Sequence, residues 1–223
     1  MKTYQIAIDG PAASGKSTAA KIVAERLGFL YVDTGAMYRA FTLLMMEKGL
    51  DTKSREDAKT LLGTFTVNED RDGHIFLNGK DVTKRVREQD VTSLVSYACA
   101  HKEVREHLVK LQQEMARNDS VVMDGRDIGT VVLPFATLKV FQVASVEARA
   151  KRRYLEEQQK GSAMTLPEIE ADLKRRDDID SHRAVSPLTP APDSIRLDTS
   201  DLTIEEEVEK ILELFAAAKA KRS

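Results

Sequence analysis

The sequence has 223 residues, of which 42% are hydrophobic, and 34 basic against 36 acidic side chains leave a net charge of -2. This composition is typical of a folded globular protein, and the balanced charge argues against a generally basic surface for nucleic acid. A single cysteine excludes an internal disulfide, and no apolar run approaches the ~20 residues that span a bilayer. We therefore expect a cytoplasmic protein with neither nucleic-acid nor membrane partners.

A glycine-rich loop follows the first expected strand. Residues 4–9 alternate in hydrophobicity like a strand, and residues 16–27 carry apolar side chains at helical spacing. Residues 10–18 between them read GPAASGKST and match the pattern G-x-x-x-x-G-K-[ST]. In such a loop, backbone N–H groups and a helix N-terminus surround phosphate oxygens. The alternative is a chance turn of small residues, and the flanking strand and helix argue against it.

We expect this loop to bind the triphosphate of ATP. Lys16 would reach the β- and γ-phosphates, and the Ser17 hydroxyl would contact Mg²⁺. The residues assigned to the ATP site in the loop are Gly10, Ala12, Ala13, Ser14, Gly15, Lys16, Ser17 and Thr18.

The next segments repeat the alternation of strand and helix. Residues 29–32 favour a strand and end at Asp33-Thr34-Gly35, and residues 36–48 then show helical periodicity. Two successive units of this kind imply right-handed crossovers between parallel strands. The sequence therefore predicts an α/β fold with a parallel sheet flanked by helices.

The alternation breaks after the second unit. A short helix is expected over residues 54–62, followed by strands at 64–67, 73–77 and 80–82 with turn signals at 68–73 and 78–79. This pattern predicts a small antiparallel lobe inserted into the α/β fold. Two helices are expected next, at 87–98 and 102–117.

The sheet resumes at residues 121–123, which are apolar throughout and end at Asp124-Gly125-Arg126-Asp127. In a parallel sheet Asp124 would lie at the carboxyl edge beside the glycine-rich loop, where its carboxylate could hold Mg²⁺ through water. The alternative is a turn aspartate that caps a helix.

The last third of the chain contains two more strands and three more helices. Residues 138–143 and 194–197 favour strands. A basic helix around 149–153 carries Arg149 and Arg153, and it is either an exposed face or part of a lid over the triphosphate. Thr165 and Thr203 resemble helix caps, the second opening a helix to about residue 219.

Four arginines that are distant in sequence follow strand ends or lie on helices near them: Arg39, Arg126, Arg176 and Arg183. Planar guanidinium groups suit anionic oxygens, and phosphoryl transfer needs several of them. The alternative for each arginine is a solvated helix face. The four histidines show no paired spacing and Cys99 lies in an apolar stretch, so we expect no transition-metal site and a buried structural thiol.

Four motifs in this order resemble the bacterial cytidylate kinases, which are (d)CMP kinases of the nucleoside-monophosphate kinase group. The motifs are GPAASGKS at 10–17, DTGAMYR at 33–39, DGRDIGTVV at 124–132 and RDDIDSHRAVSPL at 176–188. The resemblance covers essentially the whole chain. It implies a single P-loop kinase domain over 1–223, with a monophosphate-binding region at 34–118, its antiparallel insert at about 63–83, and a lid at 149–180.

The resemblance also implies an activity, transfer of the γ-phosphoryl group of ATP·Mg²⁺ to CMP or dCMP by a monomeric enzyme. It assigns the monophosphate to Thr34, Arg39, Arg126 and Arg183, cytosine to Ser96, Arg105 and Asp127, and the sugar to Arg176 and Asp180. The implied catalytic residues are Lys16, Arg183 and Asp124, and the implied lid contacts to ATP are Arg149 and Arg153. Thr34 departs from the serine of many relatives but keeps the hydroxyl.

Two alternatives are weighed against this interpretation. Another small-molecule P-loop kinase, such as a UMP/CMP kinase or a shikimate kinase, does not fit the inserted lobe or the trio Ser96, Arg105 and Asp127. A GTP-binding switch would need a guanine-reading Asn-Lys-x-Asp motif, which the sequence lacks.

Overall fold

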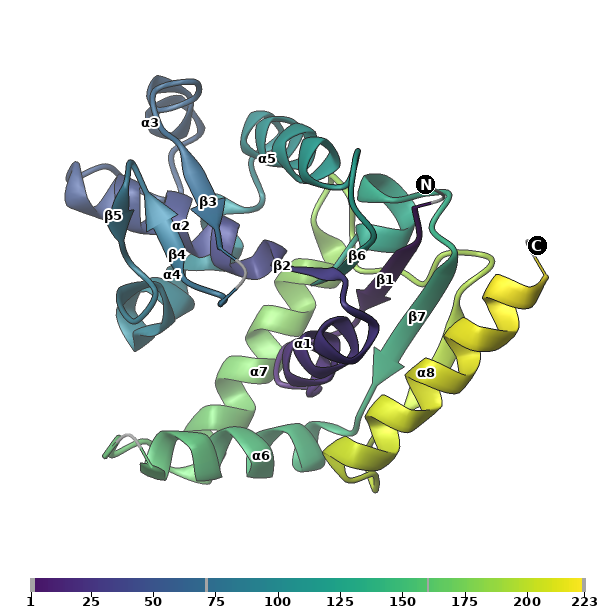
Figure 1. The fold of residues 1–223 in the computed structure, drawn as a ribbon. Coiled ribbons are helices and arrows are strands. Elements are labelled where there is room, and N and C mark those ends of the chain that lie inside the picture. The colour runs from purple at the N-terminus through teal and green to yellow at the C-terminus, as the bar shows by residue number, and fades with distance from the viewer. Residues whose placement is uncertain (1–2, 71, 160, 222–223) are drawn as a thin grey trace.

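A five-stranded parallel sheet forms the centre of the computed structural model, which describes residues 3–70, 72–159 and 161–221. The strand order is β2-β6-β1-β7-β8, so the strand that leads into the glycine-rich loop is the middle one (Figure 1). The strands are β1 (Gln5–Asp9), β2 (Leu30–Asp33), β6 (Val121–Gly125), β7 (Leu138–Val143) and β8 (Ile195–Asp198). All neighbours pair in parallel, which confirms the predicted fold class.

Alternate side chains of the strands enter two separate cores. Ile6 and Ile8 of β1 pack with helices α1 (Lys16–Leu27) and α8 (Ile204–Ala220) on one face. Ala7 between them belongs to the core on the other face, together with α2 (Thr34–Glu47) and α5 (Lys102–Met115). Strands covered on both faces explain why the central strands are apolar throughout.

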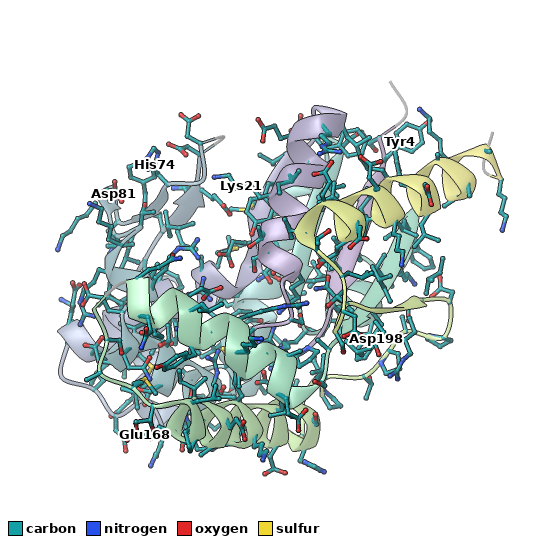
Figure 2. All side chains as sticks on the ribbon, turned by 90° about the horizontal axis from the view of Figure 1, so that it is seen from below. Tyr4, Lys21, His74, Asp81, Glu168 and Asp198 are labelled. Atoms are coloured by element: carbon teal, nitrogen blue, oxygen red, sulfur yellow. The ribbon has the colours of Figure 1, made fainter. Side chains whose placement is uncertain are left out.

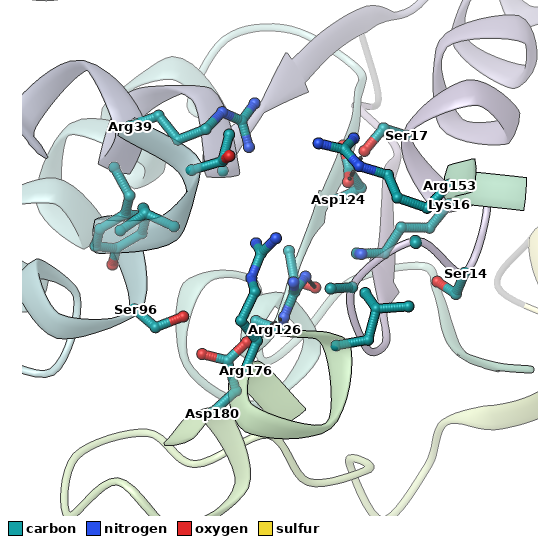
Figure 3. Close-up of a pocket in the computed structure, with 18 of the residues that line it drawn as sticks. Ser14, Lys16, Ser17, Arg39, Ser96, Asp124, Arg126, Arg153, Arg176 and Asp180 are labelled. Carbon is teal, nitrogen blue, oxygen red and sulfur yellow. Dashed lines mark hydrogen bonds and ion pairs between the residues drawn. The ribbon is translucent and has the colours of Figure 1, made fainter. Parts of the chain in front are cut away.

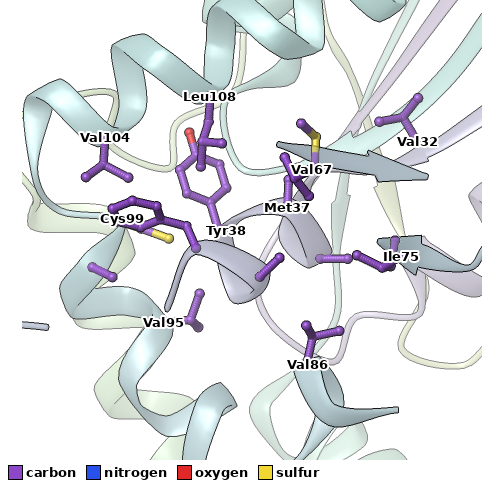
Figure 4. Close-up of a cluster of buried hydrophobic side chains, with 14 of the residues drawn as sticks. Val32, Met37, Tyr38, Val67, Ile75, Val86, Val95, Cys99, Val104 and Leu108 are labelled. Carbon is purple, nitrogen blue, oxygen red and sulfur yellow. The ribbon is translucent and has the colours of Figure 1, made fainter. Parts of the chain in front are cut away.

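The inserted lobe packs on α2. It contains α3 (Arg55–Thr60), a three-stranded antiparallel sheet of β3 (Val67–Glu69), β4 (Ile75–Leu77) and β5 (Lys80–Asp81), the 3-10 turn η1 (Arg85–Arg87) and α4 (Gln89–Ala98). Figure 4 shows Val67 and Ile75 of the lobe beside Met37 of α2. One helix therefore connects the lobe to the edge of the parallel sheet.

The sequence predicts the first strand of the lobe at 64–67. These bounds are wrong, because β3 spans Val67–Glu69. The N–H of Thr64 is held in a turn by Leu61 O at 3.1 Å. The following turn begins later than predicted because Asp70 Oδ1 accepts hydrogen bonds from the N–H groups of Asp72 and His74. Figure 2 shows Lys21 of α1 on the side of this turn. The basic helix predicted around 149–153 is longer in the structure, where it spans Val146–Gln159. The other helices and strands whose bounds were predicted agree with the observed bounds to within two residues.

Two packed helices follow β7. Helix α6 (Val146–Gln159) and helix α7 (Leu166–His182) contact each other, and α7 also contacts α4 of the lobe. Thr165 and Glu168 form the capping box that the sequence predicts at the start of α7. Among the described residues, no helix combines the length and the hydropathy that crossing a bilayer requires.

Candidate active site

A cavity of about 310 Å³ lies at the carboxyl edge of the parallel sheet, between the glycine-rich loop and helices α4 and α7. Figure 3 shows Lys16 and Ser14 on one side of it and Arg39 and Ser96 on the other. Most of the predicted site residues line this cavity. They are Ala12, Ala13, Ser14, Gly15, Lys16, Ser17, Thr18, Thr34, Arg39, Ser96, Arg105, Asp124, Arg126, Asp127, Arg153, Arg176, Asp180 and Arg183.

Two predicted ATP-site residues, Gly10 and Arg149, lie outside this lining. A Cβ atom at Gly10 would come within 2.2 Å of the carbonyl oxygen of Gln142, so the glycine permits the loop to approach β7. The Arg149 guanidinium donates to Ala12 O and Ala144 O, each at 3.1 Å, and pairs with Asp177 at 2.7 Å. In this structure Arg149 contacts the glycine-rich loop without lining the cavity.

The glycine-rich loop positions Lys16 at the start of α1. Gly15, with φ of 97°, is the N-cap of this helix, and a left-handed conformation of this kind favours glycine. Lys16 Nζ donates to Pro11 O at 3.0 Å. Burial and the nearby Arg126 lower the pKa of Lys16 to about 7, because both disfavour the ammonium form. A bound anion would remove this penalty.

Oxygen ligands suited to a divalent cation meet beside Lys16. Ser17 Oγ donates to Asp124 Oδ2 at 2.7 Å, and the Tyr31 hydroxyl donates to Asp124 Oδ1 at 2.9 Å. Burial and the neighbouring carboxylate of Asp33 raise the pKa of Asp124, so its negative charge is poorly compensated. A hydroxyl and an anionic carboxylate are the ligand types that Mg²⁺ prefers, and the pair therefore fits this ion.

The predicted arginine cluster is assembled opposite Lys16. Arg126 Nε donates to Asp180 Oδ2 at 2.8 Å, and Arg183 Nη1 lies 3.8 Å from Asp180 Oδ1. Burial alone would raise the pKa of Asp180, but these two arginines lower it. Burial and the charge of Arg126 lower the pKa of Arg176 to about 10. The cluster therefore carries more positive charge than its carboxylates neutralise.

The predicted cytosine-reading residues lie at the inner end of the cavity. Arg105 Nη2 and Asp127 Oδ2 are 2.5 Å apart, and both side chains are almost fully buried. Arg105 Nη1 also donates to Cys99 O at 3.2 Å, while Ser96 of α4 lines the same cavity. Burial raises the pKa of Cys99 to about 12, as expected for a structural thiol.

Several arginine N–H groups around the cavity are buried without a hydrogen-bond acceptor. In the part of the chain that the structure describes, the unpaired atoms of this kind on cavity-lining arginines are Arg39 Nε, Arg105 Nε, Arg176 Nε and Arg183 Nη2. Each buried donor without a partner costs ~1 to 3 kcal/mol, and more when it is charged. Acceptor atoms of a bound ligand could satisfy these groups.

Three further residues contribute to the site and were missed in the sequence. Asp9 accepts hydrogen bonds from the N–H groups of Ile128 and Gly129 at 2.7 Å each, and so fixes the loop that carries Asp127. The signal for Asp9 was an acid that ends an apolar strand. Asp33 Oδ2 accepts from Arg39 at 3.0 Å and from Arg87 at 3.1 Å. Nothing in the sequence singles out Arg87, because the lobe alone brings it to the cavity.

Asp9 and Asp33 respond differently to burial. Burial raises the pKa of Asp9 to about 6, although the hydrogen bonds that its carboxylate accepts from the N–H groups of Gly129 and Ile128 oppose this rise. For Asp33 the charges of Arg39 and Arg87 outweigh burial and lower the pKa. Asp33 therefore stays ionised and holds both arginines beside the cavity.

Comparison with known proteins agrees with this geometry. The family model "Cytidylate kinase" matches residues 6–217. Cytidylate kinase of Lactobacillus johnsonii is 49% identical over 214 residues, which cover 95% of this chain and 93% of that protein. Cytidylate kinase of Streptococcus gordonii is 50% identical, with 96% and 100% covered.

Solved structures show the same fold at lower identity. A gluconokinase from Sinorhizobium meliloti aligns with a TM-score of 0.52 and 16% identity, covering 96% of this chain and 92% of that chain. The family model and the two cytidylate kinases confirm the resemblance that the four motifs indicate. This chain belongs to the cytidylate kinase family.

Proposed function

We infer that this chain transfers the γ-phosphoryl group of ATP to CMP or dCMP, forming ADP and CDP or dCDP. The observation that supports this most directly is a single cavity that places Lys16 of the glycine-rich loop opposite arginines with unpaired buried donors. A triphosphate on one side and a monophosphate on the other would each meet the charge they require. Family membership supports the same activity.

The donor side would hold ATP through the loop N–H groups and Lys16. As the triphosphate binds, its charge offsets the burial that lowers the pKa of Lys16, and the ammonium group can then stabilise the charge of the transferring group. Ser17 and Asp124 would hold Mg²⁺, which neutralises phosphate charge when it is bound.

The acceptor side needs alignment more than proton transfer. The monophosphate oxygen is already an anionic nucleophile, so Arg39, Arg126 and Arg183 would position it and neutralise it without a strong base. Thr34 Oγ1 donates to the backbone oxygen of Asp124 at 2.6 Å, and this hydroxyl would have to turn to reach the phosphate. Arg176 and Asp180 would contact the sugar.

Base selection is proposed for the inner end of the cavity. Cytosine presents an amino donor beside two acceptors, and the pocket offers a carboxylate at Asp127, a hydroxyl at Ser96 and a cationic donor at Arg105. Arg105 Nε is buried and unpaired, so it is available to a base acceptor without breaking the pair with Asp127.

The division of the chain into an acceptor-binding region and a lid stays a prediction. We propose that 34–118 is the acceptor-binding region and that 149–180 acts as a lid, with Arg153 facing the triphosphate because it lines the cavity. Mg²⁺ as the metal, a monomeric state and a cytoplasmic location belong to the same proposal.

A coupled assay of ADP release across AMP, CMP, dCMP, UMP, GMP and shikimate tests the function. CMP and dCMP should be among the best acceptors, and poor turnover with both would refute the proposal. Tight GTP binding without phosphorylation of any acceptor would instead favour a nucleotide switch.

A further inference from the structure

A buried polar cluster lies behind the glycine-rich loop, outside the cavity lining. Its members are Gln142 at the end of β7, Arg152 of α6, Thr199 after β8 and Glu207 of α8. Gln142, Thr199 and Glu207 are at most 2% exposed. Burial of a polar group costs free energy unless the group is hydrogen-bonded, and three of these side chains direct hydrogen bonds to one peptide of the loop.

That peptide joins Ser14 to Gly15. The Ser14 carbonyl oxygen accepts a hydrogen bond from Gln142 Nε2 at 2.5 Å and another from Arg152 Nη1 at 3.0 Å. The Thr199 hydroxyl lies 3.2 Å from the same oxygen. Glu207 Oε2 and Gln142 Nε2 lie 3.2 Å and 3.5 Å from the position that a Cβ on Gly15 would take, so the carboxylate and the amide nitrogen converge beside this peptide.

The direction of the Ser14 carbonyl determines the direction of the next N–H. A trans peptide is planar, so its C=O and N–H groups point in opposite directions. The carbonyl points toward Gln142, Arg152 and Thr199, which do not line the cavity, whereas Gly15 and Lys16 do. Holding the carbonyl therefore aims the Gly15 N–H at the phosphate side of the loop.

Glu207 decides which end of the Gln142 amide faces the loop. The amide nitrogen has two hydrogens, of which one is donated to Ser14 O, and the other is available to the carboxylate that lies beside it. Without the carboxylate, the amide could turn and place its own oxygen against the Ser14 carbonyl, where two acceptors would repel. The acceptor on α8 thus keeps Gln142 a donor.

We propose that Gln142 and Glu207 are positioning residues for ATP, which together fix the Ser14 carbonyl and orient the Gly15 N–H for the triphosphate. This inference rests on the proposed function only in assigning ATP to the glycine-rich loop. It gives the C-terminal helix α8, which does not line the cavity, a specific part in nucleotide binding.

The test compares Gln142→Met, Glu207→Met and the double variant, with Gln112→Met as the matched control. Gln112 is a buried glutamine on α5, away from the loop. KM and kcat are measured for ATP and for CMP separately, and ADP affinity is measured by calorimetry without CMP. Glu207→Gln, which keeps an acceptor oxygen, serves as the conservative variant.

We call Gln142→Met and Glu207→Met the clamp variants. Each of them should raise the KM for ATP about five-fold, which is the effect of losing one neutral hydrogen bond, and should leave the KM for CMP unchanged. The double variant should resemble the single ones, because residues that act as a unit are not additive. Glu207→Gln should keep the wild-type KM, and Gln112→Met should alter stability alone. Should Gln142→Met fail to fold, Gln142→Asn withdraws the amide from Ser14 with less change.

An unchanged KM for ATP in the clamp variants would overturn the inference, and so would equal shifts for ATP and CMP. A lower KM for ATP in Glu207→Met would show that the carboxylate merely repels the triphosphate, which also overturns it. Wild-type protein that does not phosphorylate CMP would refute the proposed function instead, so the two failures are distinguishable.

Discussion

Arg105 and Asp127 form a buried ion pair, with Arg105 Nη2 and Asp127 Oδ2 2.5 Å apart. Asp9 holds the loop after Asp127 through the N–H groups of Ile128 and Gly129. Because Asp9 ends the strand that leads into the glycine-rich loop, the strand that positions the proposed ATP site also positions the proposed base-reading carboxylate. The two sites thus share one rigid support at the centre of the sheet.

Replacing Asp127 should therefore affect both selectivity and stability. Asp127→Ala removes a partner for the cytosine amino group, which we expect to lower the kcat/KM preference for CMP over UMP by ~1 to 3 kcal/mol. It also leaves Arg105 buried without its counter-charge, at a cost of ~3 to 5 kcal/mol in the free energy of unfolding. Parallel kinetics with both acceptors and urea unfolding measure the two effects.

A matched control for Asp127→Ala is Asp90→Ala, since Asp90 pairs with Arg85 on the surface. Such exposed pairs contribute little, so selectivity and stability should both stay near those of the wild type. An unchanged CMP preference in Asp127→Ala would count against its role in reading the base.

Lys16→Ala should reduce turnover with every acceptor. The ammonium group is a preorganised cation on the donor side, and the removal of one such group typically lowers kcat by roughly 10² to 10³. We expect the same proportional loss with CMP and dCMP, measured at saturating ATP. Lys21→Ala, an exposed lysine of the same helix, is the control and should retain activity. Wild-type turnover in Lys16→Ala would refute the phosphate role.

The stability of the ligand-free protein should depend on the ionisation of Lys16. Its pKa is lowered from 10.5 to about 7, so between these values the unfolded chain binds more protons than the folded one. The contribution of Lys16 to the free energy of unfolding therefore rises with pH, by ~2 kcal/mol between pH 7 and pH 9. The wild type should gain this increment relative to Lys16→Met in urea unfolding curves. Saturating ADP should shrink the difference, and parallel pH profiles without nucleotide would contradict it.

The sequence predicts those parts of the fold that depend on local pattern. Strand alternation, the glycine-rich loop and the capping box at Thr165 each follow from neighbouring residues, and the structure confirms them. The contacts of Asp33 with Arg87, or of Ser14 with Gln142, join residues that are far apart in sequence. Packing of the lobe on α2 and of α8 on the sheet creates them, and no local pattern encodes that packing.

Arg149 and Arg153 also show that a local sequence pattern does not predict which long-range contacts a side chain makes. Both were predicted to contact ATP, but only Arg153 lines the cavity, while Arg149 is buried among Ala12, Ala144 and Asp177. We expect Arg149→Met to destabilise the fold by ~3 to 5 kcal/mol, since Asp177 loses its partner in a largely buried pair. Arg153→Met should raise the KM for ATP with little loss of stability. Equal melting temperatures for the two variants would contradict this division.

Asp124 provides the sharpest test of the proposed metal site, because its carboxylate accepts from both Ser17 and Tyr31. Asp124→Asn keeps the shape of the side chain but removes the charge, and we expect the Mg²⁺ concentration for half-maximal activity to rise roughly 10- to 100-fold. Tyr31→Phe removes only the hydrogen bond to Oδ1 and should produce a smaller increase in the same direction. High Mg²⁺ should recover much of the activity of Asp124→Asn, because the defect lies in binding the ion. An unaltered Mg²⁺ titration would assign Asp124 a purely structural role in holding Ser17 and Thr34.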